Sequence, residues 1–333
     1  MGSLKRINWG KNYPGLPPLD LIEIQKTSWA DFLKTQLSHT IRSISPIVDY
    51  TGNNWQLELM DLSYDQILMT PKDAKRKGLN YTLPLRIKTR LTNKRTNAVT
   101  EENVFFFNLP TMTPEGTFII NGIERGVINQ LVRSPGIYFT GETDPATGKT
   151  LHNAEVRPVR GSWLEFFIGK KDVIFARIDR KKKFPATVIL RAVANYSDQE
   201  FVKEFSDYIL STIQADPAKT ADEAVEEFYR KLRPGEPVVL ENAYKFFQEK
   251  FFDLRTYEIG NVGRYKINKK FNFTFSDHDP TNWVLKKEDL METVKRLIGL
   301  QKGEIKTLDD IDSLANRRLR CCGEIVAQVA IRP

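Results

Sequence analysis

The sequence predicts a protein of two domains that contains both strands and helices. Its 333 residues exceed one ordinary domain and are enough for two hydrophobic cores. Alternating apolar and polar residues, which are typical of strands, recur in the first half of the chain. Apolar residues at helical spacing dominate the second half, so the period of the pattern changes along the chain.

The N-terminal segment predicts an extended arm followed by a helix. Residues 1–18 are rich in proline and glycine, and we expect them to form the arm. From Leu19 onward, apolar side chains recur at helical spacing, which gives the helix one face that can pack on a sheet. The residues of this face are Leu19, Ile22, Trp29, Phe32 and Leu33.

The segment after this helix is rich in strand patterns. Residues 85–91 alternate, so that Arg86, Lys88 and Arg90 lie on one face of a strand and the apolar residues on the other. This basic face is either a solvated sheet surface or a track for phosphates. We favour the solvated surface.

A strand, a tight turn and a helix are predicted between residues 118 and 133. Residues 118–120 are large and apolar, as in a buried strand, and the Asn-Gly pair at 121–122 supplies the positive φ angles of a tight turn. Apolar residues within 127–132 have helical spacing. Such a helix would aim Arg125 and Arg133 away from the core.

A hairpin is predicted between residues 163 and 179, and helices after it. Two apolar runs, 163–168 and 173–178, are joined by a short segment that contains glycine. Ser197 with Glu200, and Thr220 with Glu223, have the spacing of capping boxes and predict two helix starts. The first of these helices is expected to extend to Ile213. Two further helices are expected around 243–251 and 290–298.

The charge balance favours a polyanionic partner. Fifty Lys and Arg stand against 42 Asp and Glu, a formal charge of +8. An ordinary solvated basic surface is the other interpretation of this charge. No apolar run approaches the roughly 20 residues of a membrane helix, and no secretory signal pattern is present. Cys321 and Cys322 are adjacent and cannot join distant segments, so we expect a cytoplasmic protein with no membrane partner.

No set of residues has the pattern of a catalytic or metal site. The three histidines lack the spacing of metal ligands. Asp309, Asp310 and Asp312 form an acidic cluster, but a magnesium site needs converging carboxylates, and arginines follow closely. Ion pairing and helix capping are therefore the favoured roles of this cluster.

Several motifs in fixed order resemble the β subunit of bacterial-type, multisubunit RNA polymerase. The strongest is Gly116 to Gly122 followed by Glu124-Arg125 and by residues 133–139. The others are Arg160-Gly161-Ser162-Trp163-Leu164, Arg177-Ile178-Asp179-Arg180, residues 185–191, residues 233–237, residues 262–266 and residues 309–320. The resemblance covers about residues 19–324 and implies two α+β domains. A protrusion would occupy 19–122, a lobe inserted into it 123–312, and the start of the return into the protrusion 313–333.

The resemblance also implies a site for single-stranded DNA. Trp163 matches a tryptophan that stacks on an exposed base of the non-template strand near the downstream edge of the transcription bubble. Arg133, Asp312 and Arg317, with Ile311 beside them, match the pocket for the next flipped-out base, where guanine is preferred. Without the resemblance, a tryptophan such as Trp163 more often belongs to a core.

Basic residues predict contacts with phosphates. The densest run comprises Arg177, Arg180, Lys181, Lys182, Lys183 and Arg191, and Arg318 and Arg320 fit the same role. A solvated hairpin end is the other interpretation of the run. Arg125 and Ile128 match positions at the border of the family's rifamycin pocket.

The resemblance implies the N-terminal part of a β subunit, which lines the downstream DNA cleft and holds the non-template strand during DNA-templated RNA synthesis. The expected partners are DNA (the non-template strand and the downstream duplex), the β′ and α subunits, the remaining β segments and σ factor. We expect no catalytic residue and no cofactor in this part, because the Mg²⁺ of the assembled nucleotidyltransferase is held by β′. The alternatives are a free-standing nucleic-acid-binding protein derived from the lobe, and a module that docks on polymerase proteins without contacting DNA.

Overall fold

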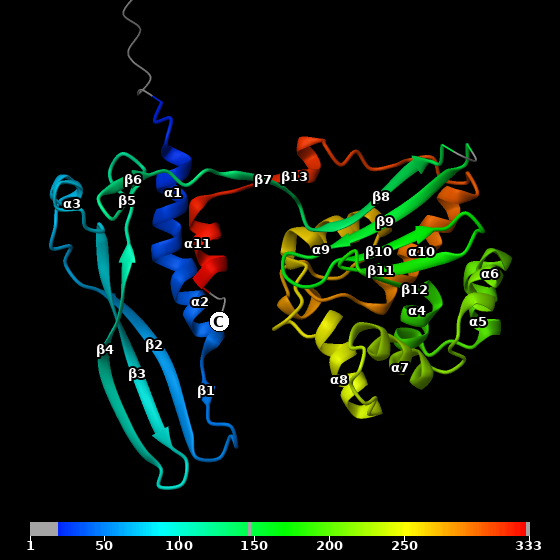
Figure 1. Ribbon diagram of the computed structural model, residues 1–333, viewed down its shortest axis with the longest axis horizontal. Coiled ribbons are helices and arrows are strands. Elements are labelled where there is room, and N and C mark those ends of the chain that lie inside the picture. The colour runs from blue at the N-terminus through cyan, green and yellow to red at the C-terminus, as the bar shows by residue number, and fades with distance from the viewer. Residues whose placement is uncertain (1–18, 146–147, 331–333) are drawn as a thin grey trace, which may run out of the picture. The chain divides into compact units, whose positions relative to one another are not determined.

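The computed structural model describes residues 19–145 and 148–330, which form two compact units (Figure 1). Unit 1 contains the residues up to 131 and those from 319 onward, and unit 2 contains residues 132–318. Unit 2 is therefore inserted into unit 1, and both combine helices with antiparallel sheets. This architecture confirms the α+β class. The expected N-terminal arm, residues 1–18, lies outside the described residues.

Unit 1 combines a four-stranded antiparallel sheet with helices. The strands, in spatial order, are β1 (Ile47–Val48), β2 (Trp55–Tyr64), β3 (Thr82–Asn93) and β4 (Ala98–Pro110). The helices are α1 (Glu23–Asp31), a π-helical turn (Phe32–Gln36), α2 (Leu37–Ile44), α3 (Pro71–Lys77) and α11 (Cys322–Ala330). On β3, Arg86 pairs with Asp65 at 2.8 Å, and Lys88 and Arg90 pair with Glu101 at 2.8 and 2.7 Å, as expected of a solvated sheet surface.

The N-terminal helix supplies much of the core of unit 1. Trp29, Phe32 and Leu37 are buried and share one apolar cluster with Leu85 of β3 and with Cys322 at the start of α11. Trp29, Phe32 and Leu33 of the predicted face therefore pack on the sheet. Leu19, by contrast, is 89% exposed and precedes the helix, which begins at Glu23, so the prediction is wrong at this end. Residues 19–37 and 322 lie far apart in the sequence, so the return of the chain into unit 1 completes this core.

The turn predicted at Asn121-Gly122 is confirmed, whereas the helix predicted after it is wrong. β5 (Phe118–Ile120) pairs with β6 (Ile123–Arg125), and both turn residues have positive φ, 50° and 75°. Residues 130–133 form strand β7 (Gln130–Arg133), which pairs with β13 (Arg317–Arg320). The strand exists because of a partner almost two hundred residues later, which local periodicity does not report.

Unit 2 is built on a five-stranded antiparallel sheet in which consecutive strands are neighbours. Its strands are β8 (Gly136–Thr143), β9 (Thr150–Arg157), β10 (Leu164–Ile168), β11 (Ile174–Ile178) and β12 (Lys182–Pro185). β10 and β11 are the predicted hairpin, with Phe166 opposite Ala176. The simple order lets each strand pair with the one before it through a short connection.

Helices follow the sheet in the sequence. They are α4 (Ala186–Ala194), α5 (Asp198–Phe205), α6 (Leu210–Ala215), α7 (Ala221–Leu232), α8 (Leu240–Phe251), α9 (Gly260–Phe271) and α10 (Lys287–Gln301), with short 3₁₀ turns at Asp207–Ile209, Pro280–Asn282 and Leu314–Asn316. The capping box of Ser197 and Glu200 is confirmed. The helix expected to reach Ile213 breaks at Ser206, whose φ of 62° is not helical.

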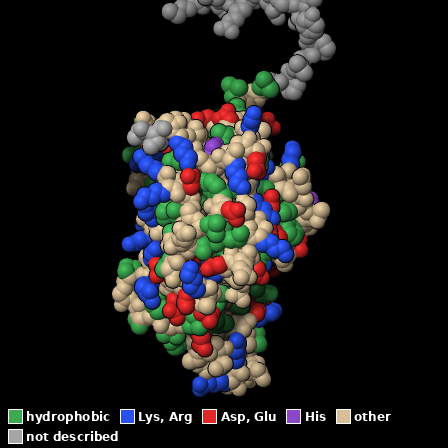
Figure 2. All heavy atoms as spheres, turned by 90° about the vertical axis from the view of Figure 1, so that its right-hand side faces the viewer, with side chains coloured by type: hydrophobic (Ala, Val, Ile, Leu, Met, Phe, Trp, Pro, Cys, Tyr) green, Lys and Arg blue, Asp and Glu red, His purple; other side chains and the backbone are tan. Residues whose placement is uncertain are grey.

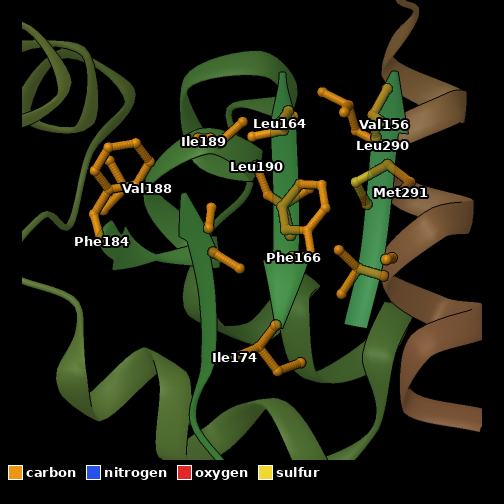
Figure 3. Packing of buried hydrophobic residues seen from close by; sticks show 14 of the residues in the cluster. Val156, Leu164, Phe166, Ile174, Phe184, Val188, Ile189, Leu190, Leu290 and Met291 are labelled. Atoms are coloured by element: carbon orange, nitrogen blue, oxygen red, sulfur yellow. The ribbon is translucent and has the colours of Figure 1, made fainter. Parts of the chain in front are cut away.

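The core of unit 2 lies between one face of the sheet and the helices (Figure 3). Leu290 and Met291 of α10 belong to the same buried cluster as Val156 of β9, and Leu190 of α4 belongs to it with Phe166 of β10. Because side chains alternate along each strand, the opposite face of the sheet carries the remaining residues. No helix within the described ranges is long and apolar enough to cross a membrane.

Candidate nucleic-acid interface

The face of the unit 2 sheet that points away from the core carries a charged row. Glu155 of β9 lies opposite Glu165 of β10, Glu165 lies opposite Arg177 of β11, and Arg177 lies opposite Lys183 of β12. Two glutamates side by side repel unless cations bind them. Four arginines supply that charge, as described below, so the row is a network of ion pairs.

Trp163 lies at the edge of this row and is held there by its backbone. It directly precedes β10, and its N–H donates to the Asp179 carboxylate at 2.9 Å, while the Asp179 N–H donates to the Trp163 carbonyl at 3.0 Å. Asp179 and Arg180 both have positive φ, 48° and 58°, and form the tight turn between β11 and β12. Gly161 is required nearby, because a Cβ there would lie 2.6 Å from the Tyr257 ring.

The indole of Trp163 is neither sealed in the core nor fully free. Its residue is 38% exposed, and the guanidinium of Arg157 lies over the ring at 4.1 Å from the centroid. Arg180 lies 5.8 Å from the same ring. Both distances are within the range of cation–π attraction, which fixes the orientation of the indole. The side chain is thus an oriented, partly exposed aromatic platform.

Glu155 connects this platform to Arg133. One carboxylate oxygen of Glu155 accepts from Arg157 at 2.9 Å and from Arg133 at 2.8 Å, and its other oxygen lies 3.7 Å from Arg180. The side chains of Glu155, Arg157 and Arg133 are 17%, 14% and 24% exposed. Burial, together with the neighbouring charge of Arg157, lowers the pKa of the Arg133 guanidinium. Excess positive charge at low exposure favours an anionic or electron-rich ligand here.

Asp312 and Arg317 form a second pair next to Arg133. Arg317 donates to the Asp312 carboxylate and, at 3.3 Å, to the carbonyl of Ile311. The Ser134 N–H donates to the Asn316 carbonyl at 2.9 Å, which places the residues after Arg133 and before Arg317 in contact. The Asp312 side chain is 83% exposed, whereas Arg317 is 30% exposed. The carboxylate therefore remains accessible while the arginine supports it.

The structure thus brings together, within unit 2, the residues that the sequence assigned to one site. Trp163 contacts Arg157, Arg157 and Arg133 share Glu155, and the charges of Arg317 and Asp312 act on Arg133. Chemically, the set offers an aromatic face for stacking, an exposed carboxylate that accepts N–H groups, and guanidinium donors for carbonyl or phosphate oxygens.

The basic run is only partly available to phosphates. Lys181, Lys182 and Lys183 are exposed. Arg177 and Arg180, by contrast, bind the Glu165 carboxylate at 2.6 and 3.1 Å, so much of their charge is neutralised.

The inclusion of Arg191 in this run is wrong. Its residue is 1% exposed, and its guanidinium donates to Asp198 at 2.6 Å and to the carbonyls of Tyr196 and Lys219. Asp216 lies 3.7 Å from it. Arg191 is a structural cation that joins α4 to the segments that follow it, because its buried guanidinium binds groups from those segments.

The remaining predicted residues lie on the strands that lead between the units and in unit 1. Arg318 is half-buried on β13. Arg320 belongs to unit 1, where it donates to Gln328 at 3.0 Å and to Gln130 at 2.6 Å. Arg125 ends β6 and is exposed, and Ile128 is 84% exposed. Their predicted contacts with phosphates and with a drug pocket stay predictions.

The acidic cluster does not converge. Asp309 binds the Lys270 ammonium at 2.6 Å and the Phe139 N–H at 2.7 Å, Asp310 accepts the Asp312 N–H at 2.9 Å, and Asp312 pairs with an arginine. Within residues 19–145 and 148–330, no group of three or more His, Cys, Asp or Glu is arranged to hold a metal ion. The predicted ion pairing is confirmed, and these donors do not fit Mg²⁺.

Charge on the visible surface is mixed. In Figure 2, Lys and Arg side chains alternate with Asp and Glu over the face that is shown, without one continuous basic patch. The formal charge of the chain therefore does not locate a binding surface, and specific contacts have to locate it.

Three residues of the network, Glu155, Arg157 and Glu165, were not predicted. The alternation in residues 150–157 places Asn153, Glu155 and Arg157 on one face of a strand. This alternation could have indicated that Glu155 and Arg157 lie on the same surface. The sequence gives no hint that this face adjoins Trp163, because the pairing of β9 with β10 decides it.

The family model and the curated relatives that match this chain all concern subunits of RNA polymerase. Residues 133–320 match the family described as "RNA polymerase Rpb2, domain 2". Similar curated proteins are the DNA-directed RNA polymerase subunit beta of Thermosynechococcus vestitus (40% identical), of Synechocystis sp. (41%) and of Trichodesmium erythraeum (42%), each over 313 residues. The alignments cover 92% of this chain but 27–28% of each relative. The chain thus spans little more than a quarter of the length of these relatives.

Proposed function

Because this chain belongs to the RNA polymerase β-subunit family, matching its Rpb2 domain 2, we propose that it serves as the N-terminal part of a β subunit in DNA-directed RNA synthesis. Unit 2 then corresponds to the lobe and unit 1 to the protrusion. The proposed partners are DNA, the β′ and α subunits, the remaining β segments and σ factor, in the cytoplasm. Arg125 and Ile128 would border the rifamycin pocket.

The proposed task of unit 2 is to hold the non-template strand of an open bubble. One unstacked base stacks on the Trp163 indole, and the next base, preferably guanine, meets Asp312. The carboxylate accepts from the ring N–H and the exocyclic amino group of guanine, and Arg317 or Arg133 donates to O6 or to a phosphate. Ile311 provides an apolar neighbour at the same loop.

One observation carries this proposal. An indole that is 38% exposed lies in the same ion-pair network as the arginine next to an 83% exposed aspartate. A tryptophan sealed in the core could not reach a base, and an aspartate that only paired with Arg317 would gain little from such exposure. Stacking on a base is worth about 1–3 kcal/mol, enough to hold a flipped nucleotide.

Nucleotidyl transfer is assigned to other parts of the enzyme. From the family to which the chain belongs, we propose that the catalytic Mg²⁺ of the assembled enzyme is held by β′. The contribution of this chain is then to position DNA, with Trp163 and Asp312 as binding residues.

The test is the binding of open-bubble DNA by polymerase that contains this chain. Trp163→Ala is expected to weaken binding by about 5- to 150-fold, which corresponds to one stacked base. Trp55→Ala is the matched control, because Trp55 is 47% exposed on β2 of unit 1. Equal affinities of the Trp163 variant and the wild type would refute strand binding. Loss of subunit assembly with unchanged DNA affinity would instead support the docking alternative.

A further inference from the structure

A cavity of about 330 Å³ opens beside the proposed strand-binding residues in unit 2. Helix α9 contributes one side of it, and β8 and the loop before β13 contribute the others. Its polar lining comprises Tyr138, Tyr265, Lys266, Lys269, Lys270, Asp309 and Asn316. The proposed function assigns no ligand contact to these residues.

The cavity is strongly cationic. Three ammonium groups face a single carboxylate in its lining, that of Asp309, which Lys270 binds at 2.6 Å. Lys270 also donates to the Ile137 carbonyl at 2.6 Å, and Lys266 donates to the Ala315 carbonyl at 2.9 Å and to the Asn316 side chain at 3.5 Å. Because an ammonium has three donors, one donor remains on each of these two lysines. Among the described residues, Lys269 has no side-chain hydrogen bond or ion pair, and it is exposed.

Helix geometry explains only part of this cluster. Lys269 and Lys270 lie in the last turn of α9, where cations complement the partial negative charge of a helix end. Lys266 lies a full turn earlier and points into the same cavity. Burial lowers the pKa of Lys266 and of Lys270, which means that the protein does not fully compensate their charge. A bound anion would stabilise the charged form of both lysines.

The cavity is continuous with the strand-binding residues. Asn316 precedes Arg317, and the Tyr138 hydroxyl donates at 2.7 Å to the carbonyl of Ser134, which follows Arg133. The positive charges of Arg157 and Arg133 act on Tyr138. A nucleotide held at Asp312 would therefore have its backbone close to the lysines.

We propose that the cavity lined by Lys266, Lys269 and Lys270 binds a backbone phosphate of the same single strand that Trp163 and Asp312 hold. The inference rests on the proposed function and adds a phosphate site to it. Tyr265, which is 53% exposed at the cavity, offers a hydroxyl donor or a ring beside the sugar. Lysine ammonium groups recognise a phosphate as a point charge and do not read base identity.

The test compares Lys269→Ala with Lys203→Ala in polymerase that contains this chain. Both residues are exposed lysines of unit 2 without a side-chain partner among the described residues, so each change removes one charge without breaking a contact. Lys269→Ala is expected to reduce the slope of log affinity against log salt by about 0.7, the contribution of one single-strand phosphate. Between about 50 and 200 mM salt, the wild type would then lose about 2.6-fold more affinity than the variant. Lys203→Ala should keep the wild-type slope.

A scan of the non-template strand with neutral methylphosphonates locates the contact. One position should weaken binding by the wild type and not by Lys269→Ala, while the guanine preference at Asp312 persists. If the two lysine variants have equal slopes and no position distinguishes them, the proposal is overturned even if Trp163→Ala still weakens binding. Saturable binding of inorganic pyrophosphate that Lys269→Ala abolishes, with an unchanged DNA slope, would show a site for free phosphates and would also overturn it.

Discussion

Removing the Arg157 guanidinium should free the Trp163 indole from the ion-pair network that contains Arg133, so that its orientation is no longer fixed. The guanidinium lies 4.1 Å from the indole centroid and donates to Glu155 at 2.9 Å. A cation–π contact at a partly exposed ring is worth about 0.5–1 kcal/mol. If this contact holds the indole in its base-stacking orientation, Arg157→Ala should weaken binding of open-bubble DNA by about 2- to 5-fold.

A double-mutant cycle separates this effect from a simple loss of charge. In a Trp163→Ala background the orientation of the indole no longer matters, so Arg157→Ala should cost less there than in the wild type. Arg157→Lys keeps the charge for Glu155 but loses the planar group that stacks, and it should behave like Arg157→Ala in the cycle. Fluorescence titration of labelled bubble DNA measures all four corners. Equal costs of Arg157→Ala in both backgrounds would refute the coupling.

Three further outcomes are expected. Asp312→Asn should reduce the preference for guanine in competition between bubbles by about 5- to 150-fold, because the amide cannot accept from both N–H groups, and an unchanged preference would contradict the assignment. Arg264→Leu should lower the free energy of unfolding in urea by about 3–5 kcal/mol, because it leaves Asp289 charged and buried. The Arg264 guanidinium and the Asp289 carboxylate are 2.8 Å apart, and both side chains are 0% exposed. A loss of unfolding free energy below about 1 kcal/mol would exclude Arg264 as the group that compensates the Asp289 charge. Asp198→Asn should make the stability of the fold depend less on pH in the acid range. The hydrogen bond from Arg191 lowers the pKa of Asp198 below its usual 3.8. The ionised carboxylate therefore stabilises the fold above that pH, and this stabilisation is lost as the pH falls through the lowered pKa. Identical melting temperatures of variant and wild type down to about pH 2 would contradict this.

Each stability measurement has an internal control. Replacing Asp289 by Leu in the Arg264→Leu chain removes the uncompensated charge and should restore part of the stability, whereas a defect of packing alone would persist. For the acid titration, the difference in stability between the two chains should be constant near neutral pH, where the Asp198 carboxylate is ionised in both the folded and unfolded states. It should shrink as the pH falls through the lowered pKa of Asp198.

Structural elements that depend on contacts between neighbouring residues were predicted correctly from the sequence. The Asn121-Gly122 turn, the hairpin of residues 164–178 and the Ser197 cap each depend on contacts within a few positions, and all three are present. For Trp163, the residue type alone favoured a core position, and only the resemblance of its motif implied an exposed aromatic residue. The residue's exposure of 38% agrees with that interpretation rather than with a core tryptophan.

Elements that depend on distant partners did not follow from the sequence. Residues 127–132 have the apolar spacing of a helix, but residues 130–133 form a strand, because residues 317–320 pair with them. Arg191 lies in a sequence rich in cations but is buried, because Asp198 and Asp216 bind it from later segments.

The amino-acid sequence by itself determined the family, the α+β class and the identity of the residues proposed to hold DNA, since motifs and short-range periodicity are local properties. Tertiary structure alone decided that Arg157 lies on Trp163, that Glu155 joins it to Arg133, and that three lysines share one cavity. The physical reason is that charge pairing and stacking act over a few ångströms in space. Strand register and helix packing set those distances between residues that the chain itself keeps far apart.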